Sequence, residues 1–297
     1  MRTIFLALAL LAAPAIGQEH KPMRPATADE QKARAAVVIA DYRFDDLLWE
    51  NDRIAYRIYG HALEKAEPPS SSGIDAWGKR VRWPFMDRQL RTGDQHADHG
   101  EGVDFYNVGT GRGIGGLGIW HDNKLWTSRN YVRPHILKSG PDIADFTVDY
   151  APWPVDTLRT VQETRRFTLP AGTNFTRLTS TIASNSDAEL IVGIGISKRP
   201  INGDKPGEIE KDSAGARMSW WGPADGEKGR MAAAVIVDPA AFAGFAEDSD
   251  NYLILVRVQP GRPFVYYSGA AWDRGGDFAT QADWNGYVDA QRADFRP

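Results

Sequence analysis

Cysteine is absent from all 297 residues of the chain. Disulfides, thiolate nucleophiles, cysteine zinc sites and iron–sulfur clusters are therefore excluded. The chain also has no excess of positive charge: 35 Lys and Arg against 39 Asp and Glu give a net charge of −4. It therefore lacks the basic surface that is typical of a nucleic-acid-binding protein. No segment beyond the N-terminus is long and apolar enough for a membrane helix. What is present, 42% hydrophobic and 25% charged residues, is typical of a globular domain with a sizeable core.

The N-terminus has the organisation of a secretory signal peptide. Arg2 precedes an apolar run over residues 4–15, too short to span a bilayer comfortably, and small residues follow at Ala15 and Gly17. This pattern predicts a signal peptide over residues 1–17, cut before Gln18, and hence a periplasmic or extracellular protein. The polar, proline-containing residues 18–28 are expected to form a mobile leader. Residues 29–297 show no long linker and are expected to form one domain.

Most of the remaining chain predicts β-strands. Runs rich in β-forming residues, several with apolar and polar residues alternating, occupy residues 54–59, 165–169, 175–182, 190–196, 231–237, 252–258 and 264–267. Turn-forming clusters separate them, and Asp122-Asn123 indicates a hairpin. Residues 29–40 favour a short helix or a strand, and residues 283–294 a helix with an apolar stripe. The expected fold is all-β: a mainly antiparallel sandwich with a few short helices, mainly at the two ends.

Residues that can carry chemistry are concentrated between Trp49 and His135, most densely over residues 95–106. Imidazoles and carboxylates alternate at His96, Asp98, His99, Glu101 and Asp104. Such groups transfer protons near neutral pH or bind a divalent cation. A polar surface loop is the alternative interpretation. No helical His-Glu-x-x-His pattern and no calcium-loop pattern is present, so we expect no cofactor, with a divalent cation as the second hypothesis.

A glycine-rich stretch follows at residues 108–118. Gly111, Gly113 and Gly116 match Gly-x-Gly-x-x-Gly, but a hairpin follows them instead of the helix that a dinucleotide site requires. We expect these glycines to permit tight turns or a close approach of backbone, for example to a sugar. Trp220 and Trp221 are adjacent, so on a strand they face opposite sides, and one of them is expected to form a cleft wall.

Four short blocks resemble known proteins. Residues 48–60, with Glu50-Asn51-Asp52 leading into a strand, resemble the N-terminal strand of galactose-mutarotase-like proteins. Together with residues 72–77, 99–106 and 267–272, they resemble an uncharacterised family of secreted bacterial proteins associated with gene sets for pectin and other uronate polysaccharides. The resemblance implies a β-supersandwich that acts on sugars. Mutarotases use a His and a Glu as acid and base, which implies His99, His121 or His135 with Glu101.

These patterns predict an exported enzyme acting on acidic oligosaccharides or polysaccharides by elimination, epimerisation or hydrolysis, with a non-catalytic glycan-binding protein as the alternative. In an elimination, His99 or His96 would be the base and Tyr106 the acid, while a cation, Arg112 or Arg133, neutralises the uronate carboxylate. Hydrolysis would need two carboxylates, for which Glu101 and Asp104 are nearest. The predicted catalytic residues are His99, Glu101, His135 and Tyr106, and the predicted substrate-binding residues are Arg112, Arg133, His96, Trp120, His121 and Trp221. We expect His99, Glu101, Arg112 and His135 to converge on one cleft.

Overall fold

The computed structural model describes residues 20–198 and 206–297, so the expected signal peptide lies outside the described residues. The strands form three sheets. The first is ordered β1 (Ala35–Ala40), β2 (Asp46–Asn51), β3 (Ala55–Ile58), β4 (Asp75–Lys79), β5 (Gly102–Val103). The second is ordered β13 (Glu208–Asp212), β14 (Arg217–Trp221), β15 (Met231–Val237), β18 (Pro263–Trp272), β11 (Phe175–Ser184), β10 (Thr160–Pro170), β9 (Ile143–Pro154), β8 (Arg133–Ser139). The third is ordered β16 (Phe242–Glu247), β17 (Asn251–Val258), β12 (Leu190–Ser197), β6 (Ile114–His121), β7 (Lys124–Trp126).

The strand pairs within these sheets are antiparallel, which confirms the predicted all-β, antiparallel architecture. The predicted hairpin is also present, because Asp122 and Asn123 adopt left-handed φ angles of 52° and 55° between β6 and β7. Such a pair of left-handed residues is what a tight two-residue hairpin requires.

Helices are short and are not confined to the chain ends. Residues 29–40 were expected to form a short helix or a strand, and they contribute to both, because α1 (Ala28–Lys32) is followed by β1. The late helix is present as α4 (Gln281–Asp289). Contrary to expectation, further helical turns lie in connections between strands. They are α2 (Leu63–Ala66), α3 (Met86–Leu90) and the 3-10 turns η1 (Asp41–Arg43) and η3 (Gly226–Lys228). The connections that hold α2 and α3 are long and irregular, and single helical turns satisfy part of their backbone.

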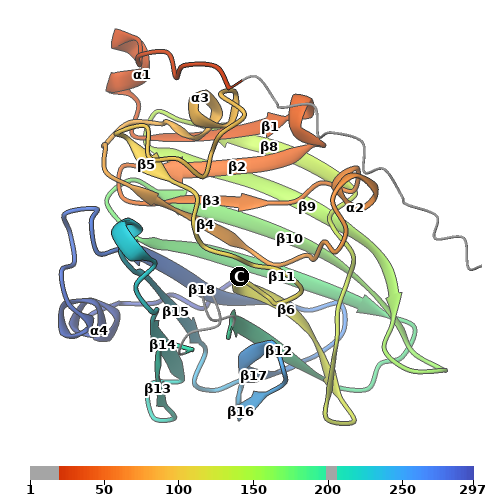
Figure 1. Ribbon diagram of the computed structural model, residues 1–297. Helices are drawn as coiled ribbons and strands as arrows, with labels where there is room; N and C mark the ends of the chain where they lie inside the picture. The colour runs from red at the N-terminus through yellow and green to blue at the C-terminus, as the bar shows by residue number, and fades with distance from the viewer. Residues whose placement is uncertain (1–19, 199–205) are drawn as a thin grey trace, which may run out of the picture.

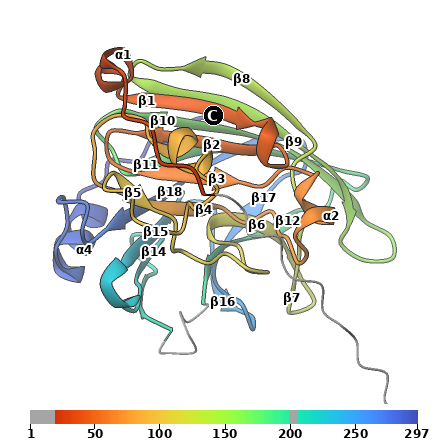
Figure 2. The same ribbon diagram turned by 45° about the horizontal axis from the view of Figure 1, so that its top comes forward.

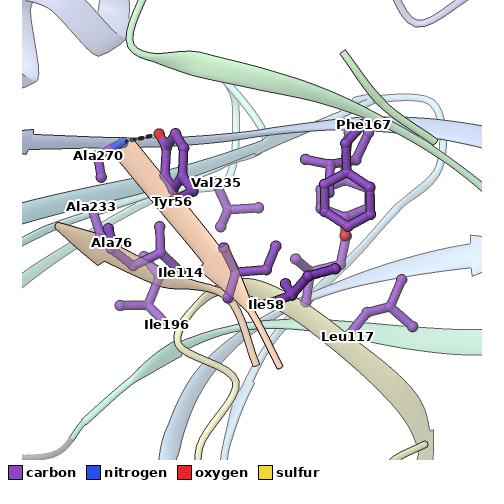
Figure 3. Close-up of a cluster of buried hydrophobic side chains, with 14 of the residues drawn as sticks. Tyr56, Ile58, Ala76, Ile114, Leu117, Phe167, Ile196, Ala233, Val235 and Ala270 are labelled. Atoms are coloured by element: carbon purple, nitrogen blue, oxygen red, sulfur yellow. Dashed lines mark hydrogen bonds between the residues drawn. The ribbon is translucent and has the colours of Figure 1, made fainter. Parts of the chain in front are cut away.

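The first and third sheets pack against one face of the eight-stranded sheet (Figures 1 and 2). Figure 3 shows part of the core where the three sheets meet, with Tyr56 and Ile58 of β3 among residues from β4, β6, β10, β12, β15 and β18. The Tyr56 hydroxyl accepts a hydrogen bond from the Ala270 backbone at 2.9 Å and donates one to the Asn174 carbonyl at 2.7 Å. The hydroxyl thus joins β3 to two neighbouring segments of the large sheet.

Helix α4 covers part of the opposite face of the large sheet, and this position corrects one sequence expectation. Trp284 of α4 is fully buried and stacks on Phe175, with ring centroids 5.9 Å apart. Trp221, expected to form a cleft wall, is buried in the same cluster and only 8% exposed. Trp220 is 2% exposed on the inner face. Both faces of β14 are covered, so neither tryptophan is available to a ligand as predicted.

The residues of the expected leader that the structure describes lie against the domain. Lys21 donates its backbone N–H to the Thr92 carbonyl at 2.9 Å, and Met23 packs against the small core on the outer face of the first sheet. Thr27 then caps α1 through a reciprocal pair of hydrogen bonds with Glu30.

Candidate functional site

A cavity of about 410 Å³ opens on the outer face of the first sheet. Its floor comes from β3 and the residue after it, because Arg57 and Tyr59 are two positions apart and share the face opposite Tyr56. The segment after β5 supplies Asp104 to Gly109, and the loop after α3 supplies Gln95 and His96. Arg43, Glu67 and Lys228 complete the charged part of the lining. The cavity therefore holds imidazole, phenol, carboxylate and cationic groups together.

Arg57 is the centre of a buried ionic cluster at this floor. Its Nη2 lies 2.7 Å from Asp75 Oδ2 and 3.0 Å from Asp104 Oδ2, and its Nη1 lies 3.8 Å from Asp46 Oδ2. The guanidinium also lies over the rings of Tyr59 and Trp77, at 5.0 and 5.1 Å. Three carboxylates thus share one guanidinium in a place where water is largely excluded.

The crowding of negative charge changes the acidity of these carboxylates. Burial, followed by the nearby charge of Asp104, raises the pKa of Asp75 to about 7. Burial also raises the pKa of Asp46 to about 6, although Arg57 and Arg43 act in the opposite direction. The cluster therefore retains protons at pH values where an ordinary Asp is ionised. The same burial, with Asp75 beside it, raises the pKa of Tyr59 well above its ordinary value, so that its hydroxyl remains a proton donor.

His96 stands at the mouth of the cavity with its side chain 63% exposed. Its Nδ1 lies 3.0 Å from the backbone carbonyl of Asp104 and 3.6 Å from that residue's carboxylate. A carbonyl oxygen only accepts, so Nδ1 carries the proton in this contact. In the neutral ring Nε2 is then the basic atom, 3.2 Å from the amide Nε2 of Gln95. From the sequence, His96 was expected to bind substrate or, in place of His99, to act as the base, and its surroundings suit a base.

Two residues predicted to be catalytic, His99 and Glu101, do not line this cavity. His99 Nε2 lies 2.8 Å from the Asp94 carbonyl, a contact that fastens the loop containing His96. Glu101 makes an ion pair with the buried Arg88 and accepts a hydrogen bond from Trp83 Nε1 at 3.3 Å. In the structure both residues hold the loops that surround the cavity.

Other predicted site residues lie elsewhere on the described surface. His135 and Arg133 are exposed on β8, at the edge of the eight-stranded sheet, and Arg133 lies 3.6 Å from Asp149. His121 and Trp120 end β6, with His121 Nε2 3.3 Å from Asp122. None of these residues lines the cavity that holds His96.

Tyr106 and Arg112 lie closer to the cavity. Tyr106 lines it, with its ring edge against Trp220 at 6.0 Å, and burial raises the pKa of its hydroxyl. Arg112 lines a second cavity of about 290 Å³ that shares Ser70 and Ser71 with the first. The expected convergence of His99, Glu101, Arg112 and His135 on one cleft is therefore not seen in these two cavities: only Arg112 lines either of them.

The glycine-rich stretch approaches the protein's own backbone. A Cβ on Gly113 would lie 1.9 Å from the Ile74 carbonyl oxygen, and one on Gly116 would lie 2.5 Å from the Arg112 carbonyl oxygen. Gly113 also has a positive φ of 61°. These glycines let β6 pass close to the strand end at Ile74, which fixes the backbone on either side of Arg112.

The carboxylates considered for a divalent cation each pair with a different arginine. Asp98 contacts Arg80 at 2.9 Å, Glu101 contacts Arg88, and Asp104 contacts Arg57. Across residues 20–198 and 206–297, no group of three or more His, Asp or Glu side chains is arranged to hold a metal ion.

Sequence reasoning missed Arg57, Tyr59 and Asp75 as site residues. A signal was available, because Arg57 and Asp75 each interrupt an otherwise apolar strand: Ala55-Tyr56-Arg57-Ile58 and Ile74-Asp75-Ala76-Trp77. A charge in such a position must find a buried partner. Opposite charges on two strands close in the chain therefore indicate a buried ion pair.

Comparison with known proteins gives two matches. The model of a domain of unknown function, DUF4861, matches residues 13–296. The protein described as "Uncharacterized protein P7" from Formosa agariphila is 30% identical over 262 residues. That match covers 83% of this chain and 64% of the relative, so the chain spans less than two thirds of the relative's length. In the part of the chain that the structure describes, no helix has the length and hydrophobicity needed to cross a membrane.

Proposed function

The chain belongs to the DUF4861 family of domains of unknown function, and from the geometry of its own site we propose that it is an exported enzyme acting on acidic, uronate-containing oligosaccharides by proton transfer. The observation that carries the proposal is the cavity in which His96, Tyr59 and three cationic side chains meet. The signal-peptide pattern of residues 1–17 supports export. A carbohydrate substrate is what the resemblance of residues 48–60 to galactose-mutarotase-like proteins implies.

The charge of the cavity supports an anionic substrate. Arg43, Arg57 and Lys228 line it against the carboxylates of Glu67 and Asp104. Glu67 pairs with Arg43 at 2.7 Å, and Asp104 with Arg57 at 3.0 Å, which leaves Lys228 as the third cation. A uronate carboxylate beside Lys228 would have its charge neutralised, which makes the hydrogen on the adjacent carbon more acidic.

Proton abstraction at that carbon is the reaction that the side chains favour. His96 Nε2 takes the proton from the carbon beside the carboxylate. In an elimination, the electron pair left behind forms the double bond to the next carbon, the glycosidic carbon–oxygen bond breaks, and the Tyr59 hydroxyl protonates the leaving oxygen. In an epimerisation, the same carbon is reprotonated from the other side. Hydrolysis is less favoured, because both carboxylates of the lining are held by arginines.

Two matched substitutions test the assignment of the base. His96→Gln and His99→Gln change the same side chain three positions apart, inside and outside the cavity lining. The purified variants are incubated with galacturonate, glucuronate and alginate oligosaccharides, while the absorbance of unsaturated uronate, reducing ends and anomeric proton spectra are followed. We expect His96→Gln to lower turnover by about 10²- to 10⁴-fold. His99→Gln should lower it far less, because the glutamine amide can still donate to the Asp94 carbonyl that holds the loop.

The readouts separate the alternatives. Unsaturated uronate identifies elimination, reducing ends without unsaturation identify hydrolysis, and altered proton spectra alone identify epimerisation. Loss of turnover in His99→Gln but not in His96→Gln would identify His99 as the base. Binding without turnover by the wild-type protein across the whole panel would identify a glycan-binding protein and refute the proposed enzyme.

A further inference from the structure

Arg112 differs from the other buried arginines of the described chain. Arg57, Arg88 and Arg165 each make an ion pair with a carboxylate. Arg112 is only 2% exposed, and among residues 20–198 and 206–297 no carboxylate makes an ion pair with it. A buried charge that makes no ion pair is costly, and strongly perturbed ionisable groups of this kind are enriched at functional sites.

The contacts of Arg112 hold its guanidinium in place without neutralising it. Nη1 donates to Ser72 Oγ at 2.9 Å, and Nη2 lies 3.4 Å from the Thr110 carbonyl. The Arg112 backbone N–H donates to Asn251 at 2.6 Å. Burial and the neighbouring charge of Arg165 lower the pKa of Arg112 to about 10, although Tyr150, Asp248 and Asp250 act in the opposite direction, so the group is still cationic at neutral pH.

The cavity in front of Arg112 is polar and has room for a ligand. It measures about 290 Å³, and hydroxyl-bearing residues Ser70, Ser71, Thr127 and Ser128 line it. Glu64 is the one carboxylate residue of the lining, and it already makes an ion pair with Arg129. The lining therefore carries the positive charge of Arg112 in excess.

This second cavity adjoins the first, because Ser70 and Ser71 line both. We propose that the Arg112 cavity is a second subsite, which binds the carboxylate of a uronate next to the sugar held in the His96 cavity. The inference rests on the proposed function and narrows it: the substrate is an oligosaccharide with anionic groups on adjacent sugars, not a single uronic acid or a glycan with isolated charges.

The experiment compares the binding of uronates of increasing length. Mono-, di- and trigalacturonate, the matching glucuronate and alginate series, and neutral galactose oligosaccharides of equal length are titrated calorimetrically into wild-type protein. The variants are Arg112→Met, Arg112→Lys and, as a matched control, Arg257→Met. Arg257 is exposed on β17 and lines neither cavity. Arg112→Lys keeps the charge and serves as the test should Arg112→Met fail to fold.

In the wild type we expect affinity to rise from the monomer to the dimer or trimer of one uronate series, and not in the neutral series. Arg112→Met should weaken binding of the longer uronates about 10- to 100-fold and change monomer binding little, because only the longer ligand reaches Arg112. Arg112→Lys should lie between wild type and Arg112→Met, because it keeps the charge but loses the forked geometry. Arg257→Met should match the wild type.

The outcomes keep the two proposals distinguishable. If Arg112→Met loses affinity equally for monomer and trimer, the second subsite is overturned. It is also overturned if Arg112→Met loses no affinity relative to Arg257→Met, even where turnover is seen. A length-dependent loss without turnover supports the subsite and refutes the enzyme. Absence of binding by every uronate refutes both.

Discussion

The buried carboxylate of Asp75 is expected to make the stability of the folded protein depend on pH. The pKa of Asp75 is raised from an ordinary value of 3.8 to about 7, first by burial and then by Asp104. The folded protein therefore binds more protons than the unfolded chain between these two pH values. Stability must then fall as the pH rises through this window and level off above about pH 7. We predict that Asp75→Asn removes the part of this slope that Asp75 contributes and leaves the smaller part that comes from Asp46.

The magnitude follows from the size of the shift. Each pKa unit corresponds to about 1.4 kcal/mol, so a shift of about three units amounts to about 4 kcal/mol. Asparagine has the shape of protonated aspartate, and its amide oxygen can accept the hydrogen bonds that Asp75 Oδ2 receives from Arg57 at 3.0 Å and Trp77 at 3.1 Å. At pH 8 we therefore expect Asp75→Asn to be more stable than wild type by about 2–4 kcal/mol, with the difference vanishing near pH 4.

The assay is urea unfolding followed by tryptophan fluorescence at pH values from 4 to 8. Asp277→Asn provides a control of opposite sign. Burial alone would raise the pKa of Asp277, but hydrogen bonds from Arg82 and Arg53 lower it overall. Asp277→Asn should therefore lose stability at neutral pH and approach the wild type as the pH falls. Parallel pH curves for wild type and Asp75→Asn would refute the reasoning, because they would show that Asp75 is ionised without cost.

Three further predictions concern backbone, packing and processing. Gly113→Ala should destabilise the protein by several kcal/mol, since its Cβ would lie 1.9 Å from the Ile74 carbonyl oxygen. Gly261→Ala has a similar φ of 73° but open space, and should cost only about 1–2 kcal/mol in urea unfolding. Trp284→Ala should lower the free energy of unfolding by about 3–5 kcal/mol in the same measurement, because the side chain is fully buried between α4 and the large sheet. Mass spectrometry of the exported protein should find Gln18 as the first residue, and a retained N-terminus would contradict the signal peptide.

The fold was predictable because most of its strands carry their own signal. Alternation along β10 and β11 matches their burial; β11 was expected within two residues of its bounds, whereas β10 begins five residues before the expected run. The Trp220-Trp221 prediction failed because alternation places two neighbours on opposite faces but does not tell whether a helix distant in the chain covers the second face. Here α4, some sixty residues later, does so.

The candidate site was predictable only in part, since proximity along the chain does not give proximity in space. His96 and Tyr106 line the first cavity together, while His99 and Glu101, from the same short stretch, point into contacts with the surrounding loops. Arg57 lies about forty residues earlier, and the pairing of β3 with β4, together with the return of the chain after β5, brings it to Asp104. Such a meeting depends on the order of strands in the sheet, which no local pattern specifies.

The register of strand β3 determines both how the core packs and how the cavity floor is arranged. Tyr56 is anchored by its hydroxyl on one face while Arg57 meets its carboxylates on the other. A pairing slip of one residue would turn Arg57 toward the apolar interior and Tyr56 toward the acids, which would leave a buried charge without its partners. Because that form is costly, the contacts that complete the core also favour the pairing that places the arginine at the cavity floor.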